Sequence, residues 1–162
     1  MPELPEVETI VRGLRGAILG RRIMSVRLGK TDFIDDPAAI AEKLPGTRIA
    51  AIERVGKFIS FRLEPPSNGG KDVQFFVHLG MTGQLIPRAA ADPAAPHTHV
   101  YLELDDGREL RYTDARRFGR MGLRGEDAKS DPQKGLGAEP LEISEREFVE
   151  KLRERRARIK AL

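Results

Sequence analysis

Cysteine is absent from the 162-residue sequence, and its absence removes two classes of site. Without thiolate ligands the chain cannot build a cysteine-ligated zinc site, and without disulfides nothing points to an oxidising compartment. Long apolar runs are also missing, since no stretch approaches the roughly 20 residues that a membrane span needs. Three glutamates precede the first basic residue, which does not resemble a secretory signal. We therefore expect a cytoplasmic protein that does not use a membrane.

The residues that are present give a soluble globular composition, with 40% hydrophobic and 33% charged residues. The length is near the usual size of one domain. The net charge is only +3, but basic residues concentrate in two segments, 108–124 and 151–160. Local basic patches attract a phosphate backbone, although a solvated charged surface is the simpler explanation of either segment taken alone.

The N-terminal region predicts a helix over residues 5–19. Its apolar residues recur on one face at helical spacing, Pro5 suits the first turn, and Gly20 suits the stop. Gly13 and Gly16 weaken this helix intrinsically, so we expect another part of the molecule to pack closely against their side.

The middle of the chain predicts mainly strands, because apolar alternation is interrupted by glycine-rich turns. The expected elements are a short helix at 36–44 and strands at 22–28, 47–55, 57–63, 73–79, 99–104, 108–112 and 120–124. Residues 80–83 are expected to form a sharp turn and 89–96 a surface loop. Such short strands favour an antiparallel sandwich or barrel with helices at its edges. Ser144 and Glu147 have capping-box spacing and predict a helix that runs toward the chain end.

The segment that carries chemistry begins at Pro2. Removal of Met1, which is usual before a small residue, would leave Pro2 as a free secondary amine with a pKa near 8. Such an amine can attack an aldehyde-like carbon to give a cationic iminium, and Glu3 beside it could donate or accept a proton. From composition alone the simpler interpretation stays open, because prolines and acidic residues are also favoured where helices begin.

Five ordered segments carry a family resemblance. They are PELPEVET at 2–9, GK at 56–57, HLGMTG at 78–83, YTDARRFG at 112–119 and LGAEPL at 136–141. Together they resemble the N-terminal half of the bacterial formamidopyrimidine-DNA glycosylases, over essentially the whole chain. The resemblance implies an α+β, mostly β fold, a two-layer antiparallel β-sandwich with flanking helices.

The resemblance implies a base-excision-repair DNA glycosylase with abasic-site lyase activity by β,δ-elimination. Pro2 would attack the sugar C1′ and release the damaged base through a Schiff base. Glu3 would protonate the sugar ring oxygen, and Lys57 would contact phosphate at the lesion and assist catalysis. Glu6 matches an acidic residue near the pocket. The resemblance also implies a monomer, located in the bacterial cytoplasm at the nucleoid. Its expected partner is double-stranded DNA with oxidised purines (8-oxoguanine, formamidopyrimidines) or abasic sites.

The same resemblance implies a set of DNA contacts. An extruded nucleotide leaves a hole in the duplex, and Met81, Arg116 and Phe118 match the side chains that fill it. Arg117 and His78 match phosphate contacts, and His97 matches a further DNA contact. Without the resemblance, core packing is the simpler interpretation of Met81 and Phe118, and His78 and His99 could be ordinary strand histidines.

The sequence departs from the family pattern in two places. Ala115 stands where the family usually has proline, which loosens that loop but keeps its DNA-reading residues. The family's C-terminal half, with its helix–two-turns–helix module and zinc finger, is missing. We therefore expect a catalytic domain at 1–140, a linker and helix start at 141–162, no cofactor in this chain, and the one family zinc in the missing half. The chain by itself should bind duplex DNA weakly and turn over poorly.

Two other functions remain open. The chain could be a homologue that binds damaged DNA without catalysis, or a glycosylase of the endonuclease VIII branch, which removes oxidised pyrimidines. That branch typically has glycine where Leu4 stands and builds its hole-filling residues differently. Leu4, together with Met81, Arg116 and Phe118, favours the purine-directed branch.

Overall fold

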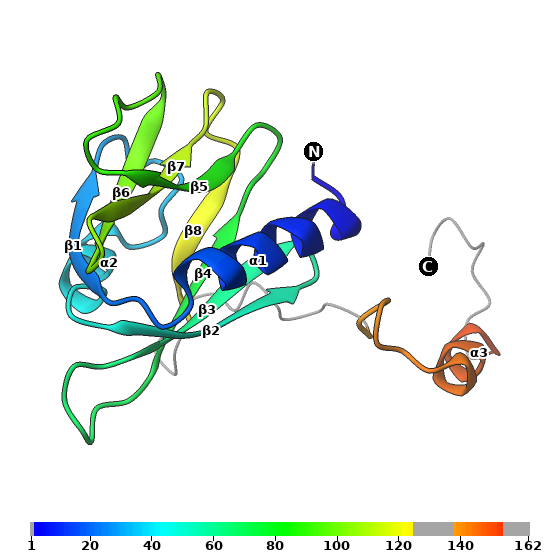
Figure 1. Cartoon of the computed structure of the whole chain (residues 1–162). Helices are drawn as coiled ribbons and strands as arrows, with labels where there is room; N and C mark the ends of the chain where they lie inside the picture. The colour runs from blue at the N-terminus through cyan, green and yellow to red at the C-terminus, as the bar shows by residue number, and fades with distance from the viewer. Residues whose placement is uncertain (1, 125–137, 154–162) are drawn as a thin grey trace. The chain divides into compact units, whose positions relative to one another are not determined.

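The computed structural model describes residues 2–124 and 138–153 of the chain (Figure 1). The chain divides into two compact units, residues 1–132 and 133–162. No helix in the described part of the chain is long and apolar enough to cross a membrane.

The first unit is a sandwich of two antiparallel sheets, as the sequence predicted (Figure 1). One four-stranded sheet has the order β1-β6-β7-β5, and its strands are β1 (Ile23–Leu28), β6 (Thr98–Leu104), β7 (Arg108–Thr113) and β5 (Gln84–Ala89). The other has the order β2-β3-β4-β8, and its strands are β2 (Arg48–Val55), β3 (Phe58–Glu64), β4 (Val73–His78) and β8 (Arg120–Arg124). Alternate residues of these strands face the space between the sheets and form the core.

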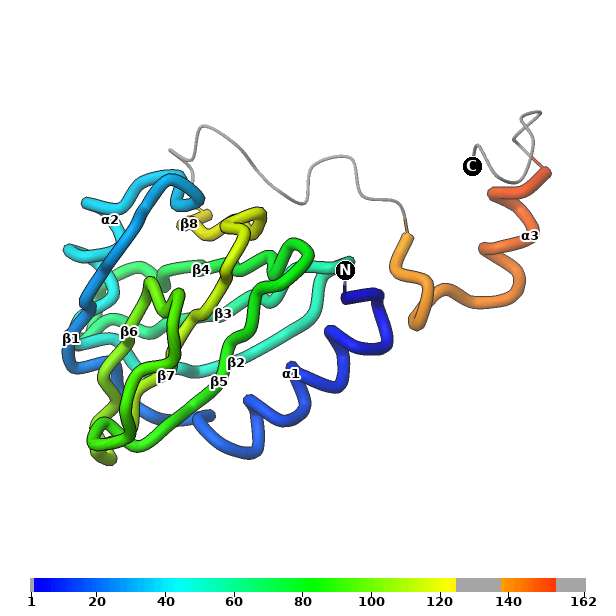
Figure 2. Tube along the Cα trace, turned by 90° about the horizontal axis from the view of Figure 1, so that it is seen from above, coloured from blue at the N-terminus to red at the C-terminus, as the bar shows by residue number. Residues whose placement is uncertain are grey.

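Helix α1 (Leu4–Ile18) packs against β2, β3 and β5, and Figure 2 shows it running alongside the sandwich. Its buried face is the predicted apolar stripe of Val7, Val11, Leu14 and Ile18. The expectation of close packing at Gly13 and Gly16 is wrong, because both are exposed and a Cβ on either would meet nothing within 4 Å. Low helix propensity at Gly13 and Gly16 therefore does not identify the side of α1 that packs against the protein.

The other elements of this unit follow the predicted segments closely, with one omission. Helix α2 (Pro37–Lys43) begins where Asp36 Oδ1 accepts a hydrogen bond of 3.0 Å from the Ala39 amide. Strand β5 was not predicted from the sequence. It is an edge strand paired with β7, it contains Pro87, and only its Leu85 is buried.

Burial of aromatic side chains between the sheets is a stabilising contribution that a single substitution can test. Phe61 of β3 is 1% exposed and packs against Phe75 of β4, with ring centroids 5.5 Å apart. Phe61→Ala is expected to lower the free energy of unfolding by about 3–5 kcal/mol, measured by urea denaturation. Met24→Ala, at a site 52% exposed, serves as the control and should change it by less than about 0.5 kcal/mol. Equal effects at the two sites would contradict the assigned core.

The second unit contains helix α3 (Glu145–Arg153). The predicted start of this helix is confirmed, because Ser144 Oγ accepts a hydrogen bond of 3.3 Å from the Glu147 amide. The predicted continuation toward the chain end falls on residues 154–162, outside the described part of the chain, as do residues 136–137 of the LGAEPL segment.

Candidate active site and nucleic-acid interface

The first candidate pair, Glu3 and Lys57, meets at the N-terminus of α1. Glu3 is the N-cap of α1 with an extended backbone, so Pro2 precedes the helix. Lys57 follows Gly56 in the β2–β3 turn, where Gly56 adopts a positive φ of 59°. The Lys57 Nζ lies 2.8 Å from the Glu3 Oε2. The two residues predicted to act together are therefore in direct contact, although they lie far apart in the sequence.

A buried arginine that the sequence did not single out connects this turn to α1. The side chain of Arg54 is only 3% exposed, and its Nε donates to Glu8 Oε2 on α1 at 2.9 Å. Its Nη1 donates to the Gly56 carbonyl at 3.0 Å, immediately before Lys57. Arg54 thereby fixes the position of the lysine relative to the helix that carries Glu3.

Charge and hydrogen bonding from Lys57 set the protonation state of Glu3, the neighbour of Pro2. The hydrogen bond and positive charge of Lys57 hold the pKa of Glu3 below its usual value, so Glu3 is ionised at neutral pH. The Glu6 Oε2 accepts a hydrogen bond of 2.9 Å from the Glu3 amide. This contact places Glu6 at the helix start, and its expected role near the pocket stays a prediction. Pro2 itself is partly buried, and Met1 lies outside the described residues.

Three exposed side chains form a second cluster on two different loops. Met81, in the turn between β4 and β5, is 46% exposed, and Phe118, in the loop between β7 and β8, is 58% exposed. Arg116 lies between them: its Nη1 is 3.5 Å from the Met81 Sδ, and its guanidinium carbon lies 4.8 Å from the Phe118 ring centroid. Neither Met81 nor Phe118 belongs to the core, so the core-packing interpretation of these two residues is wrong.

Strand register places both groups at one end of the sandwich. Phe58, next to Lys57, pairs with His78 at the end of β4, and His78 also pairs with Arg120 at the start of β8. In the other sheet, Gln84 at the start of β5 and Thr98 at the start of β6 both pair with Thr113 at the end of β7. The β2–β3 turn and the loops that carry Met81, His97 and Phe118 therefore emerge from the same end.

Half-buried His78 lies between the two groups. Its Nδ1 accepts a hydrogen bond of 3.0 Å from the Gly80 amide, and its ring contacts the Phe58 ring at 4.9 Å. Burial, then the positive charges of Lys57 and Arg120, lower the pKa of His78. A neutral ring whose Nδ1 accepts must carry its proton on Nε2, which leaves an N–H available to a phosphate oxygen.

The lowered pKa gives His78 a testable pH dependence. Because the unfolded chain binds the proton more readily, the contribution of His78 to stability is lost as pH falls below about 6.5. Titration by NMR of the ring protons should give a pKa for His78 below that value, whereas replacing Lys57 by methionine should raise it toward the ordinary value. A His78 pKa above 6.5 in the unchanged chain would contradict this environment.

Of the remaining predicted DNA contacts, His97 is exposed, whereas Arg117 is half-buried and has an acidic partner. Its Nε lies 3.0 Å from both carboxylate oxygens of Asp32, and Arg117 has a positive φ of 54°. The hydrogen bond from Arg117 lowers the pKa of Asp32 below its usual value. His97 is exposed with a positive φ of 65°. His99, by contrast, is a buried strand histidine whose Nε2 lies 3.1 Å from the Asp114 carbonyl oxygen.

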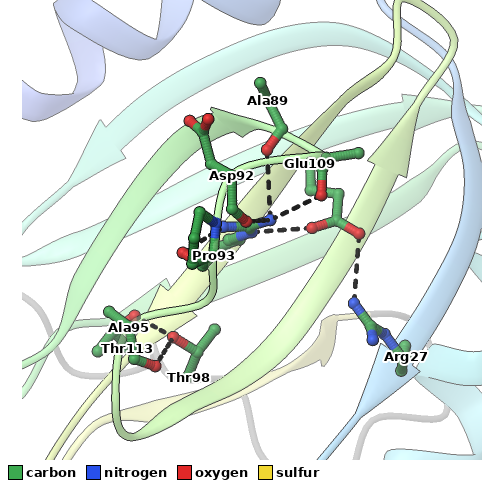
Figure 3. A network of polar contacts seen from close by, with 10 residues as sticks. Arg27, Ala89, Asp92, Pro93, Ala95, Thr98, Glu109 and Thr113 are labelled. Atoms are coloured by element: carbon green, nitrogen blue, oxygen red, sulfur yellow. Dashed lines mark hydrogen bonds and ion pairs between the residues drawn. The ribbon is translucent and has the colours of Figure 1, made fainter.

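The basic segment 108–124 does not form one phosphate-binding patch. Arg111 is 6% exposed, donates to Glu109 at 2.8 Å and binds backbone carbonyls of the 89–96 loop (Figure 3). Arg108 binds Asp106 at 2.6 Å, and Arg120 forms two hydrogen bonds of 3.0 Å with Asp35. Each of these arginines is held by its own acidic partner, and the phosphate-binding interpretation of the charge cluster is wrong for the buried Arg111. In the other basic segment, Lys151 and Arg153 are exposed, and residues 154–160 lie outside the described part of the chain.

No group of three or more His, Cys, Asp or Glu side chains that could hold a metal ion occurs among residues 2–124 and 138–153.

Comparison with known proteins assigns this chain to a family. The profile of the formamidopyrimidine-DNA glycosylase N-terminal domain matches residues 1–121. Among curated relatives, the formamidopyrimidine-DNA glycosylase of Heliobacterium modesticaldum is 41% identical over 171 residues, which cover 100% of this chain and 60% of the relative. That of Brevibacillus brevis is 42% identical over 149 residues, which cover 89% of this chain and 51% of the relative. The chain thus spans between 51% and 60% of the length of such relatives.

Solved structures agree with the sequence relatives. The complex between the Lactococcus lactis Fpg and an abasic site containing DNA superposes with a TM-score of 0.70 at 30% identity, and the match covers 78% of this chain and 44% of that one. The complex of that protein with N7-benzyl-Fapy-dG containing DNA gives 0.69 at 31% identity, covering 76% and 44%. The fold and these relatives define the class: the chain corresponds to the N-terminal domain of DNA glycosylases. More particularly, it belongs to the formamidopyrimidine-DNA glycosylase family.

Proposed function

We propose that this chain carries the nucleophile, the proton-transfer group and the hole-filling residues of a bifunctional glycosylase and abasic-site lyase in base-excision repair. The observation that carries the proposal is the contact between Glu3 and Lys57 beside Pro2, at the same end of the sandwich as exposed Met81, Arg116 and Phe118. The substrate is double-stranded DNA with an oxidised purine or an abasic site.

The first step forms a bond between the Pro2 nitrogen and C1′ of an extruded deoxyribose, after removal of Met1. The electron pair of the bond to the base leaves with the base, and solvent supplies the proton that neutralises it. The new ammonium nitrogen then gives its proton to the Glu3 carboxylate, whose lowered pKa means that it starts ionised. Glu3 therefore acts as a relay, which receives a proton before it donates one.

The second step opens the sugar ring. The nitrogen lone pair forms the C1′ iminium while the bond from C1′ to the ring oxygen breaks, and Glu3 returns its proton to that oxygen. Loss of a C2′ proton then drives elimination of the 3′ phosphate, because the adjacent iminium accepts the electron pair; the same sequence at C4′ releases the 5′ phosphate. In this scheme Lys57 exchanges its contact with Glu3 for a phosphate at the lesion, and Arg117 and His78 bind neighbouring phosphates.

Borohydride trapping tests the chemistry against a binding module without catalysis. Reduction of the iminium should leave a stable covalent adduct between the Met1-processed chain and a duplex that contains an abasic site. The Lactococcus lactis protein serves as the positive reference. Because the chain spans little more than half of its relatives, we expect the adduct to form slowly at low protein concentration and to increase as the concentration is raised. No adduct at any concentration, with the reference positive, favours the binding module.

A lesion panel separates the two glycosylase branches. Duplexes with 8-oxoguanine or a formamidopyrimidine should lose the damaged base faster than duplexes with an oxidised pyrimidine, because Leu4 and the hole-filling set match the purine-directed branch. Preference for the oxidised pyrimidine would assign the chain to the endonuclease VIII branch instead.

A further inference from the structure

The loops that carry the hole-filling side chains converge on one buried carboxylate. Asp114 is 0% exposed, and its two oxygens accept four hydrogen bonds from both loops and from β7. The donors are Thr82 Oγ1 at 2.6 Å, Tyr112 Oη at 2.9 Å, the Gly119 amide at 3.0 Å and the Arg116 amide at 3.2 Å. No other carboxylate in the described part of the chain is as deeply buried.

These donors keep Asp114 charged despite its burial. Burial by itself would raise the pKa of the carboxyl, but the hydrogen bonds from Thr82, Gly119, Tyr112 and Arg116 outweigh it, so the pKa lies below its usual value. An ionised carboxylate accepts at both oxygens and donates nothing, which suits a site surrounded by four donors.

The two loops are also too close to hold other side chains between them. A Cβ added to Gly80 would lie 2.5 Å from the Phe118 carbonyl carbon, and one added to Gly119 would lie 1.9 Å from the Tyr112 Oη. A third loop joins through the backbone, because the Asp114 amide donates to the His97 carbonyl at 3.0 Å. Glycines therefore allow the close approach, and Asp114 supplies the polar link.

We infer that Asp114 is a positioning residue that holds the loop of Met81 in register with the loop of Arg116 and Phe118. Through it the three exposed side chains enter a duplex as one preassembled unit. The Thr82 hydroxyl is the only side chain of the Met81 loop among the four donors, so it is the hydrogen bond through which Asp114 holds that loop. The inference rests on the proposed function for its consequence in DNA, but the coupling itself exists in the free protein.

Thr82 offers a matched pair of variants that leaves Asp114 and Tyr112 in place. Thr82→Val keeps the shape and removes the donor, whereas Thr82→Ser keeps the donor. In the free chain, NMR should detect a nuclear Overhauser contact between the Met81 methyl and the Arg116 side chain, and Thr82→Val should abolish it while Thr82→Ser retains it. Retention of the contact in Thr82→Val overturns the coupling, whatever the activity of the chain.

The consequence in DNA is read from the ratio of trapping rates on duplex and single-stranded abasic DNA. Thr82→Val should trap the duplex about tenfold more slowly than the unchanged chain, the effect of one lost bond to a charged acceptor, and trap the single strand at the unchanged rate. Thr82→Ser should resemble the unchanged chain on both. An equal loss on both DNAs would indicate a merely structural role and overturn the inference. If the unchanged chain traps neither DNA, the proposed function fails, and the NMR contact still decides the coupling.

Discussion

A variant with Met81→Ala, Arg116→Ala and Phe118→Ala is expected to form the trapped adduct with a duplex abasic site roughly 100-fold more slowly than the unchanged chain. Holding a nucleotide out of the stack costs a few kcal/mol, and about 1.4 kcal/mol changes a rate tenfold. The three side chains are exposed or clustered at one end of the sandwich, where they can offset that cost. Single-strand trapping should change little, because no stack has to be opened.

The control for this variant is Met24→Ala, which removes an exposed apolar side chain from β1. It should trap both DNAs at the unchanged rate. If the triple variant and the control trap the duplex equally fast, the exposed cluster has no part in opening the stack.

Glu3→Gln is expected to slow formation of the trappable iminium by about 100-fold or more, the usual contribution of a positioned proton-transfer group. The glutamine preserves size and a hydrogen-bond acceptor for Lys57, but it cannot accept the proton from the Pro2 nitrogen. Glu53→Gln, at an exposed position of β2, is the matched control and should retain the unchanged rate. Rates of borohydride-trapped adduct formation are measured on a duplex with a formamidopyrimidine, and equal rates for the two variants would exclude Glu3 as the relay.

The apolar pattern was sufficient to predict most of the fold. Buried positions of α1 and of the strands recur at the periods of helix and strand, so their segments were predicted to within one or two residues. Strand β5 was not predicted because it lies at a sheet edge, where only Leu85 is buried and the apolar alternation is absent. The packing predicted at Gly13 and Gly16 was wrong because helix propensity does not indicate which side of a helix is buried, and the side with these glycines is exposed.

The candidate site was predictable only where a motif carried it. Pro2, Glu3 and the residues of the HLGMTG and YTDARRFG segments stand out in the sequence, and the structure brings them to one end. Their supporting partners do not stand out, because Asp32 and Arg117 are 85 residues apart and Glu8 and Arg54 are 46 apart. Asp114 was within a quoted motif, but nothing local marks a carboxylate that collects donors from two loops.

The most direct test of Pro2 as the nucleophile locates the covalent bond. After borohydride trapping on abasic DNA and protease digestion, mass spectrometry should find the reduced sugar on the N-terminal peptide, at the nitrogen of Pro2, with Met1 removed. An adduct on the ε-amine of Lys57, or on a chain that still carries Met1, would contradict the assignment of Pro2 as the nucleophile.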